Sequence, residues 1–157
     1  HTYRVLHAAS AIGSHAVLYY KGLRGRPRPS QLCPALRPPV PVPGHASWPS
    51  GHATQAWLMM LCIEHVLQGV VPGTVVTDPP EDDGAPAPGT GDLGVISSNL
   101  RTLARRVARN REIAGLHYAS DSAHGQLLAK TIALFLTGMP ATSWFGKAVK
   151  AAKAEWK

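Results

Sequence analysis

The chain has 157 residues, with 16 Lys and Arg against nine Asp and Glu, which gives a formal net charge of +7 at pH 7. This length allows one domain around a single hydrophobic core, and the charge suits an anionic ligand, although nucleic acid or an anionic membrane would also be attracted. No uninterrupted run of about eighteen apolar residues is present, which argues against a membrane span. Two cysteines, Cys33 and Cys62, are too few for a disulfide framework, so we expect two free thiols.

The first predicted element is a helix over 2–22, because apolar residues recur there at near-helical spacing. Residues 25–49 hold eight of the fourteen prolines, which disfavour a regular helix or a central strand, so we expect a stiff extended loop. A second helix is predicted over 51–70, capped by Ser50. It is apolar on nearly every face, which is typical of a buried central helix.

Residues 72–92 are rich in Gly, Pro and acidic residues, which indicates a loop. Helices are predicted beyond it over 93–113, 117–136 and 140–156, with a break near Gly115. In the first of these we expect Leu103 to face inward, whereas Arg101 begins an i, i+4 stripe of arginines expected to face solvent. No strand or repeat is apparent, so the predicted fold class is all-α. We expect a single domain over 1–157 with loops at 23–50 and 71–92.

Three short segments, 21–29, 49–52 and 111–121, concentrate the chemistry of this chain. They supply three cations, two histidines, a carboxylate and hydrogen-bond donors at a helix start: Lys21, Arg28, Arg111, His52, His117, Asp121, Ser50 and Gly51. Guanidinium and ammonium groups neutralise the oxygens of a tetrahedral oxyanion, and backbone N–H groups complete its binding site. The composition of the three segments therefore indicates a site for an oxyanion such as phosphate or vanadate.

Within the third segment, His117 and Asp121 are four residues apart and share one helical face. The carboxylate can accept the Nδ1–H of His117, which directs Nε2 outward as a nucleophile or a metal ligand. The alternative is a structural core histidine beside an acid at a helix start. Arg111 can reach the same site only if the helix breaks near Gly115. His52 is expected to act as a general acid or base, its alternative being simply an early residue of a buried helix.

The order and spacing of these segments resemble the signature of the superfamily that joins vanadium-dependent haloperoxidases, type 2 phosphatidic acid phosphatases and bacterial non-specific acid phosphatases. The matching patterns are Lys21-x6-Arg28-Pro29, Pro49-Ser50-Gly51-His52 and Arg111-x5-His117-x3-Asp121. One departure is Asn110, where the phosphatases usually carry Ser. The resemblance implies a helical bundle of the acid phosphatase/vanadium haloperoxidase type. Because members normally carry further helices before the lysine motif, we expect an N-terminally truncated bundle.

Residues 45–55 and 111–121 are most similar to the bromo- and iodoperoxidase form of these motifs. That similarity implies a vanadium-dependent haloperoxidase, with hydrogen peroxide and a halide as substrates and vanadate as cofactor. His117 would be the vanadium ligand, and the oxyanion would be held by Lys21, Arg28, Ser50, Gly51 and Arg111. The catalytic residues would be His52, His117 and Asp121. His45 would support the site near the halide or peroxide, or is simply a loop histidine.

The main alternative is an acid phosphatase-type hydrolase that acts on a phosphate ester and needs no cofactor. In that reaction His117 attacks phosphorus and His52 protonates the leaving alcohol. A non-catalytic member of the superfamily is a further alternative. No nucleic-acid partner is expected because the aromatic residues are few and scattered, and a homo-oligomer is left open. We expect a soluble protein, periplasmic or secreted if a signal lies outside this chain, and the other arginines, Arg26 among them, at the surface.

Overall fold

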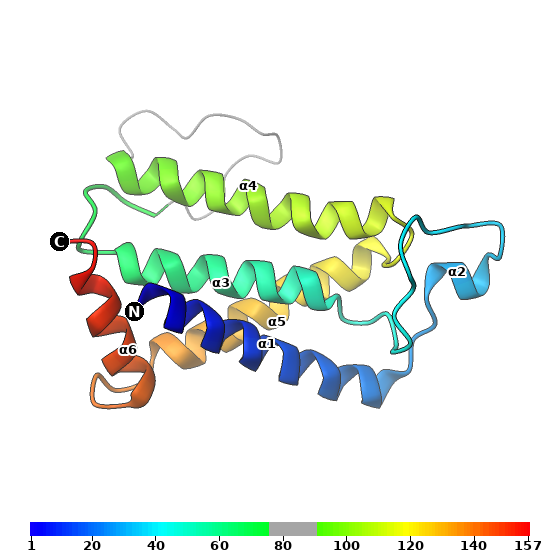
Figure 1. Cartoon of the computed structure of the whole chain (residues 1–157), viewed down its shortest axis with the longest axis horizontal. Helices are drawn as coiled ribbons and strands as arrows, with labels where there is room; N and C mark the ends of the chain where they lie inside the picture. The colour runs from blue at the N-terminus through cyan, green and yellow to red at the C-terminus, as the bar shows by residue number, and fades with distance from the viewer. Residues whose placement is uncertain (76–90) are drawn as a thin grey trace.

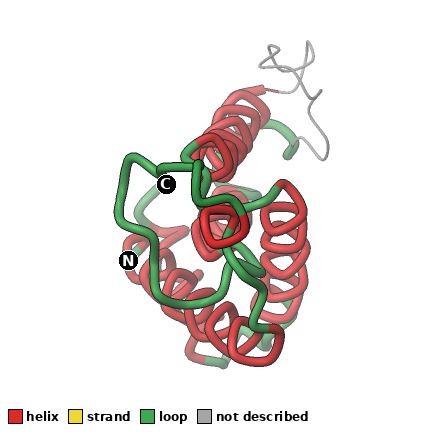
Figure 2. The backbone as a smooth tube through the Cα atoms, turned by 90° about the vertical axis from the view of Figure 1, so that its right-hand side faces the viewer, coloured by secondary structure: helices red, strands yellow, loops and turns green. Residues whose placement is uncertain are grey.

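The structure is a computed structural model that describes residues 1–75 and 91–157. All regular structure in this part of the chain is helical, which confirms the all-α prediction (Figures 1 and 2). The helices are α1 (Thr2–Arg24), α2 (Pro29–Leu32), α3 (Gly51–Leu67), α4 (Gly91–Ile113), α5 (Ala119–Thr137) and α6 (Trp144–Ala154). The predicted loop at 71–92 falls largely outside the described residues.

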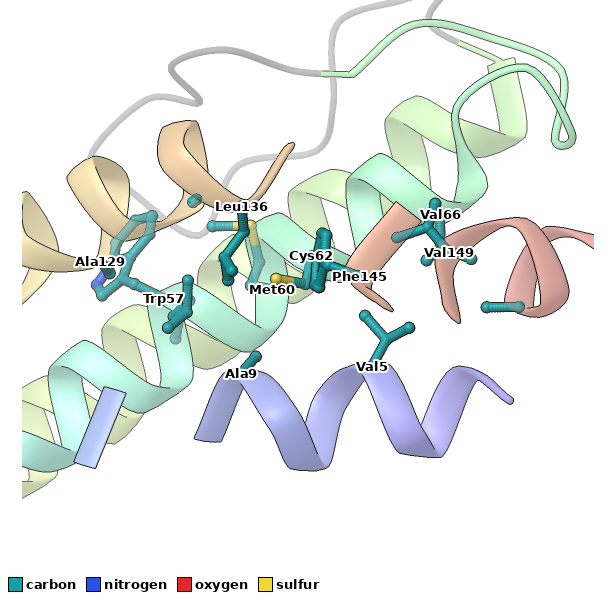
Figure 3. Packing of buried hydrophobic residues seen from close by; sticks show 14 of the residues in the cluster. Val5, Ala9, Trp57, Met60, Cys62, Val66, Ala129, Leu136, Phe145 and Val149 are labelled. Carbon is teal, nitrogen blue, oxygen red and sulfur yellow. The ribbon is translucent and has the colours of Figure 1, made fainter. Parts of the chain in front are cut away.

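Helix α3 is the central element of the bundle, as its nearly uniform apolar sequence predicts. It packs against α1, α4 and α5, and α6 lies across the end of the bundle where α1 begins (Figure 1). Within the core, Trp57 and Val66 of α3 meet Ala9 of α1, Leu136 of α5 and Phe145 of α6, all of them buried (Figure 3). Burying each of the larger side chains contributes about 1.5–3 kcal/mol.

The helix boundaries follow local capping chemistry. Helix α1 runs two residues past its predicted boundary and ends at Gly25, whose positive φ of 58° lets its N–H donate to the carbonyl oxygen of Lys21 at 3.1 Å. Ser50 caps α3 as predicted, its hydroxyl oxygen accepting the N–H of Ala53 at 3.4 Å. The predicted break after α4 is present, and Gly115 there has a φ of 68°.

Two expectations about individual segments were wrong. The predicted extended loop contains the short helix α2, because Pro29 suits the first position of a helix and the Gln31 side chain accepts the N–H of Arg28 at 2.7 Å. On α4 the predicted inward face is misplaced, since Leu103 is 58% exposed while Arg101 is only 6% exposed. Arg101 is buried because Glu64 of α3 supplies a counter-charge, with Nη2 and Oε2 2.8 Å apart.

Two further expectations concern the thiols and membrane spans. Cys33 and Cys62 are both free, as predicted. Among the helices of residues 1–75 and 91–157, none is long and apolar enough to span a membrane.

At the end of the bundle where α6 lies, Glu155 Oε2 accepts the N–H of Thr2 at 2.7 Å. The beginning of α1 and the end of α6 therefore lie together, at the opposite end of the bundle from α2 (Figure 1).

Candidate oxyanion-binding site

One cavity of about 240 Å³ brings together residues from all three motif segments. It lies where α1 ends and α3 begins, beside the loop that contains α2 (Figure 1). Its lining includes the three predicted cations, three histidines and one glycine: Lys21, Arg28, His45, Gly51, His52, Arg111 and His117. The predicted site residues Ser50 and Asp121 are fully buried and do not line it. Ser14 and Gln55 add polar groups, and Val17, Leu18 and Pro43 form an apolar wall that sequence reasoning did not anticipate.

Arg28 is the central cation of this cavity and is only 1% exposed. Its Nε donates to the carbonyl oxygen of His45 at 3.1 Å, and its Nη1 donates to the carbonyl oxygen of Leu116 at 2.8 Å. The same guanidinium lies against two imidazoles, with Nη1 3.4 Å from Nε2 of His117 and Nη2 3.1 Å from Nδ1 of His45. Because a guanidinium only donates, Nε2 of His117 acts as an acceptor in this contact. Nδ1 of His45 also lies 3.3 Å from the carbonyl oxygen of Ala46.

His117 and Asp121 are paired as expected, but His117 lies in the turn before α5 and not on the helix that was predicted to begin with it. Nδ1 of His117 lies 3.2 Å from Oδ2 of Asp121, and the same oxygen accepts the N–H of Tyr118 at 3.0 Å. Burial lowers the pKa of His117 even though the hydrogen bond to Asp121 raises it. The ring is therefore neutral near pH 7, with its proton on Nδ1 and the Nε2 lone pair directed toward the cavity.

The Asp121 carboxylate is fully buried and stays ionised because of its donors. Burial alone would raise its pKa, but the hydrogen bonds from His117 and the Tyr118 N–H and the charge of Arg26 lower it overall. Arg26 was expected to be an ordinary surface cation. Its side chain is 35% exposed, but its Nη1 also donates to the buried Oδ1 of Asp121 at 2.7 Å, which was not expected. No local pattern in the sequence indicates this pairing, because Arg26 and Asp121 are 95 positions apart.

Lys21 lines the cavity at the end of α1 and is 4% exposed. Its Nζ donates to the carbonyl oxygens of Ala46 and Ser47, the latter at 2.9 Å. Burial and the neighbouring charge of Arg28 together lower the pKa of Lys21 to about 8, and Asp121 partly opposes both effects. Lys21 is therefore charged near pH 7 but close to losing its proton.

The first turn of α3 contributes the remaining groups. The backbone N–H of Ser50 is already used, since it donates to the carbonyl oxygen of Asp121 at 3.0 Å. The Ser50 hydroxyl oxygen accepts from Ala53, so its hydrogen is available for a further acceptor. Gly51 follows, and the first N–H groups of a helix have no acceptor within it. The pKa of His52 is lowered by burial and by the positive charge of Arg111, which favours a neutral imidazole.

Arg111 gives the clearest sign that the cavity accepts an anion. Its Nε is buried, and no group in the described part of the chain pairs with it. A buried donor without an acceptor is uncommon in a folded protein. Because Arg111 lines the cavity together with Lys21 and Arg28, an oxyanion placed there would supply acceptors to three cationic side chains. The donor set therefore fits vanadate or phosphate.

Two comparisons with known proteins identify the family of this chain. A family model described as the PAP2 superfamily matches residues 3–145. A curated vanadium-dependent bromoperoxidase of Ascophyllum nodosum is 34% identical over 93 residues, which cover 57% of this chain. The match covers 17% of the bromoperoxidase, so this chain corresponds to a small part of that protein. Because the family model covers most of the chain, the chain belongs to the PAP2 superfamily.

Proposed function

We propose that the chain is a vanadium-dependent haloperoxidase-like enzyme, which oxidises a halide with hydrogen peroxide at a vanadate held by His117. The main support is that His117, with Nε2 as its unprotonated nitrogen, lines the same small cavity as Lys21, Arg28 and Arg111. A neutral imidazole is the form that coordinates a metal centre. The similarity to a bromoperoxidase supports bromide as the first halide to test.

Different residues of the site would bind different parts of vanadate. The three cations would neutralise its oxygens, with the buried Nε of Arg111 gaining the acceptor that it lacks. The Ser50 hydroxyl and the N–H of Gly51 would donate from the start of α3. His117 would supply the Nε2 lone pair while Asp121 keeps its proton on Nδ1. When bound, vanadate activates hydrogen peroxide, so that bromide is oxidised to hypobromous acid and the peroxide is reduced to water.

His52 is the group best placed to move a proton in this reaction. It lines the cavity, and its lowered pKa makes the neutral ring available to accept a proton from an incoming peroxide. His45 is held against Arg28 through its Nδ1, which fixes that guanidinium from the loop side. The apolar wall of Val17, Leu18 and Pro43 would limit the access of water to the reacting groups.

Phosphate ester hydrolysis is the second candidate function, and it is also supported by Nε2 of His117. An unprotonated Nε2 on a positioned His117 could attack phosphorus and form an N–P bond as the ester P–O bond breaks. His52, once protonated, would give its proton to the leaving alcohol, and water would then release phosphate from His117. Membership of the PAP2 superfamily agrees with either reaction.

The test uses one protein preparation in two assays. With vanadate, bromide, hydrogen peroxide and a phenolic dye, we expect dye bromination that is lost in His117→Ala. His15→Ala, which removes an exposed histidine of α1 outside the cavity, should keep it. An aryl phosphate without vanadate forms the second assay. Phosphate release that vanadate inhibits, without bromination, would replace the first proposal by the second, and no reaction together with no vanadate binding would exclude both.

A further inference from the structure

We propose that Arg26 is a positioning residue that fixes the Asp121 carboxylate and, through it, the ring of His117. This inference rests on the proposed oxyanion chemistry of the site. Arg26 does not line the cavity that holds Arg28 and Arg111. Its Nη1 instead donates to Oδ1 of Asp121 at 2.7 Å, on the side of the carboxylate away from His117.

The two oxygens of Asp121 have separate tasks. Oδ2 receives the Nδ1–H of His117 and the N–H of Tyr118, whereas Oδ1 receives Arg26. The carboxylate is fully buried while Arg26 is in place. If Arg26 is removed, Oδ1 loses that bond and water can enter the vacated space, because the Arg26 side chain is 35% exposed. Water holds a carboxylate less firmly than a guanidinium does, so the carboxylate is free to turn toward other donors. Such a turn would weaken the contact that sets the tautomer and orientation of His117.

Arg26 is itself held from several sides, as a positioning residue must be. Its guanidinium carbon lies 4.1 Å from the centre of the Tyr118 ring, in cation–π contact, and its Nη1 also donates to the Ser120 hydroxyl at 2.8 Å. Its backbone carbonyl accepts the N–H of Ser47 at 2.9 Å. Ser47 in turn accepts from Lys21 through its carbonyl oxygen. The loop that carries Arg26 is thereby tied to the end of α1 and to the beginning of α5.

If Arg26 only supported the fold, its replacement would lower the free energy of unfolding and leave vanadate affinity and the His117 tautomer unchanged. The Arg26 side chain is 35% exposed, and ion pairs that reach solvent contribute little to the free energy of unfolding. The loss of an outer partner of a metal-binding or catalytic histidine commonly reduces affinity or activity 10- to 100-fold. We therefore expect replacement of Arg26 to change the site much more than the stability of the fold.

The experiment compares Arg26→Ala, Arg26→Gln and Arg26→Lys with Arg37→Ala, which removes the same charge from an exposed position of the same loop. The first measurement is the dissociation constant of orthovanadate, determined from the change in intrinsic tryptophan fluorescence as vanadate is added. We expect Arg26→Ala to raise it about 10- to 100-fold, Arg26→Lys to restore part of the loss, and Arg37→Ala to change it less than about twofold.

The second measurement is the tautomer of His117, from long-range ¹H–¹⁵N correlation spectra recorded without any anion. The wild type should show the Nδ1–H form, and Arg26→Ala a mixture of both tautomers. A single Nδ1–H tautomer and unchanged vanadate affinity in Arg26→Ala would overturn the inference. If the wild type does not bind vanadate, the proposed function fails, whereas the tautomer comparison still decides the role of Arg26. Should the Ala variant not fold, the Gln and Lys variants carry both measurements.

Discussion

The backbone N–H of Ser50 donates to the backbone carbonyl oxygen of Asp121 at 3.0 Å, which joins the start of α3 to the first turn of α5. This contact links the second and third motif segments through the main chain. His52, in the first turn of α3, and His117, in the turn just before α5, are therefore placed relative to each other by the main chain. Gly125 allows this approach, because a Cβ built on it would lie 2.8 Å from the Ser50 carbonyl oxygen.

Gly125→Ala should therefore disturb both the fold and the site. The added methyl group would also lie 3.1 Å from the Ala53 Cβ, so α5 would have to move away from α3. We expect a loss of about 1–3 kcal/mol in the free energy of unfolding, measured by urea denaturation, together with weaker vanadate binding. Gly22→Ala is the matched control, since nothing lies within 4 Å of its Cβ position and it is helical. That change should stabilise by about 0.5–1 kcal/mol. Equal stability of the two variants would contradict the prediction.

Anion binding should weaken as the pH rises through about 8, because the pKa of Lys21 is lowered to about 8. Below that pH the ammonium is charged and attracts an anion, and above it this charge is lost. Sulfate is a suitable probe, since it stays fully ionised throughout this range. Titration calorimetry from pH 6 to pH 10 should show the loss for the wild type, whereas Lys21→Arg should retain binding to higher pH. An affinity that is constant through pH 8 in the wild type would argue against the prediction.

The buried pair of Glu64 and Arg101 should contribute to stability without contributing to the site. Arg101 donates to the Glu64 carboxylate through Nε at 3.0 Å and through Nη2 at 2.8 Å. Burial raises the pKa of Glu64, and the bonds from Ser97 and Arg101 oppose that rise. Glu64→Ala should lower the free energy of unfolding by about 3 kcal/mol, because it removes a buried counter-charge.

The control for this pair is Glu64→Leu combined with Arg101→Met, which removes both charges and should recover most of the lost stability. Vanadate affinity should be unchanged in either variant, because neither residue lines the cavity. Similar stability of the single and double variants in thermal unfolding would show that the charges do not act as a pair.

The two thiols should differ sharply in reactivity. Cys33 is exposed, whereas Cys62 is buried in the core, where burial raises the pKa of its thiol to about 12. The thiolate is the reactive form, so a disulfide reagent at pH 8 should label one thiol per folded chain and two after denaturation. Cys33→Ser should remove the labelling of the folded chain. Fast labelling of that variant would contradict the burial of Cys62.

Much of the fold could be predicted because its determinants are local. Apolar periodicity identified the long helices, and Ser50 and Gly115 marked a cap and a break that the structure contains. The face of α4 could not be assigned in the same way. An arginine stripe normally faces solvent, and the partner that buries Arg101 is Glu64, which lies on another helix 37 positions away.

In the candidate site too, contacts between residues far apart in the sequence could not be predicted. Motif spacing predicted which cations and histidines come together, because each short segment is rigid and the family pattern orders all three. The role of Arg26 was missed, since its partner Asp121 is 95 positions away and only the folded chain brings them together. The apolar wall that includes Val17 and Pro43 was missed for a similar reason, because it combines one helix with a distant loop turn.

The pairing of Thr2 with Glu155 has a practical consequence for engineering this protein. Lys21 lies at the far end of the helix that begins at Thr2, about 30 Å away at 1.5 Å of rise per residue. A tag, fluorophore or surface linker attached at either end of this chain would therefore emerge on the side remote from the cavity that Lys21 lines. Protein immobilised through either end should keep this cavity open to small solutes.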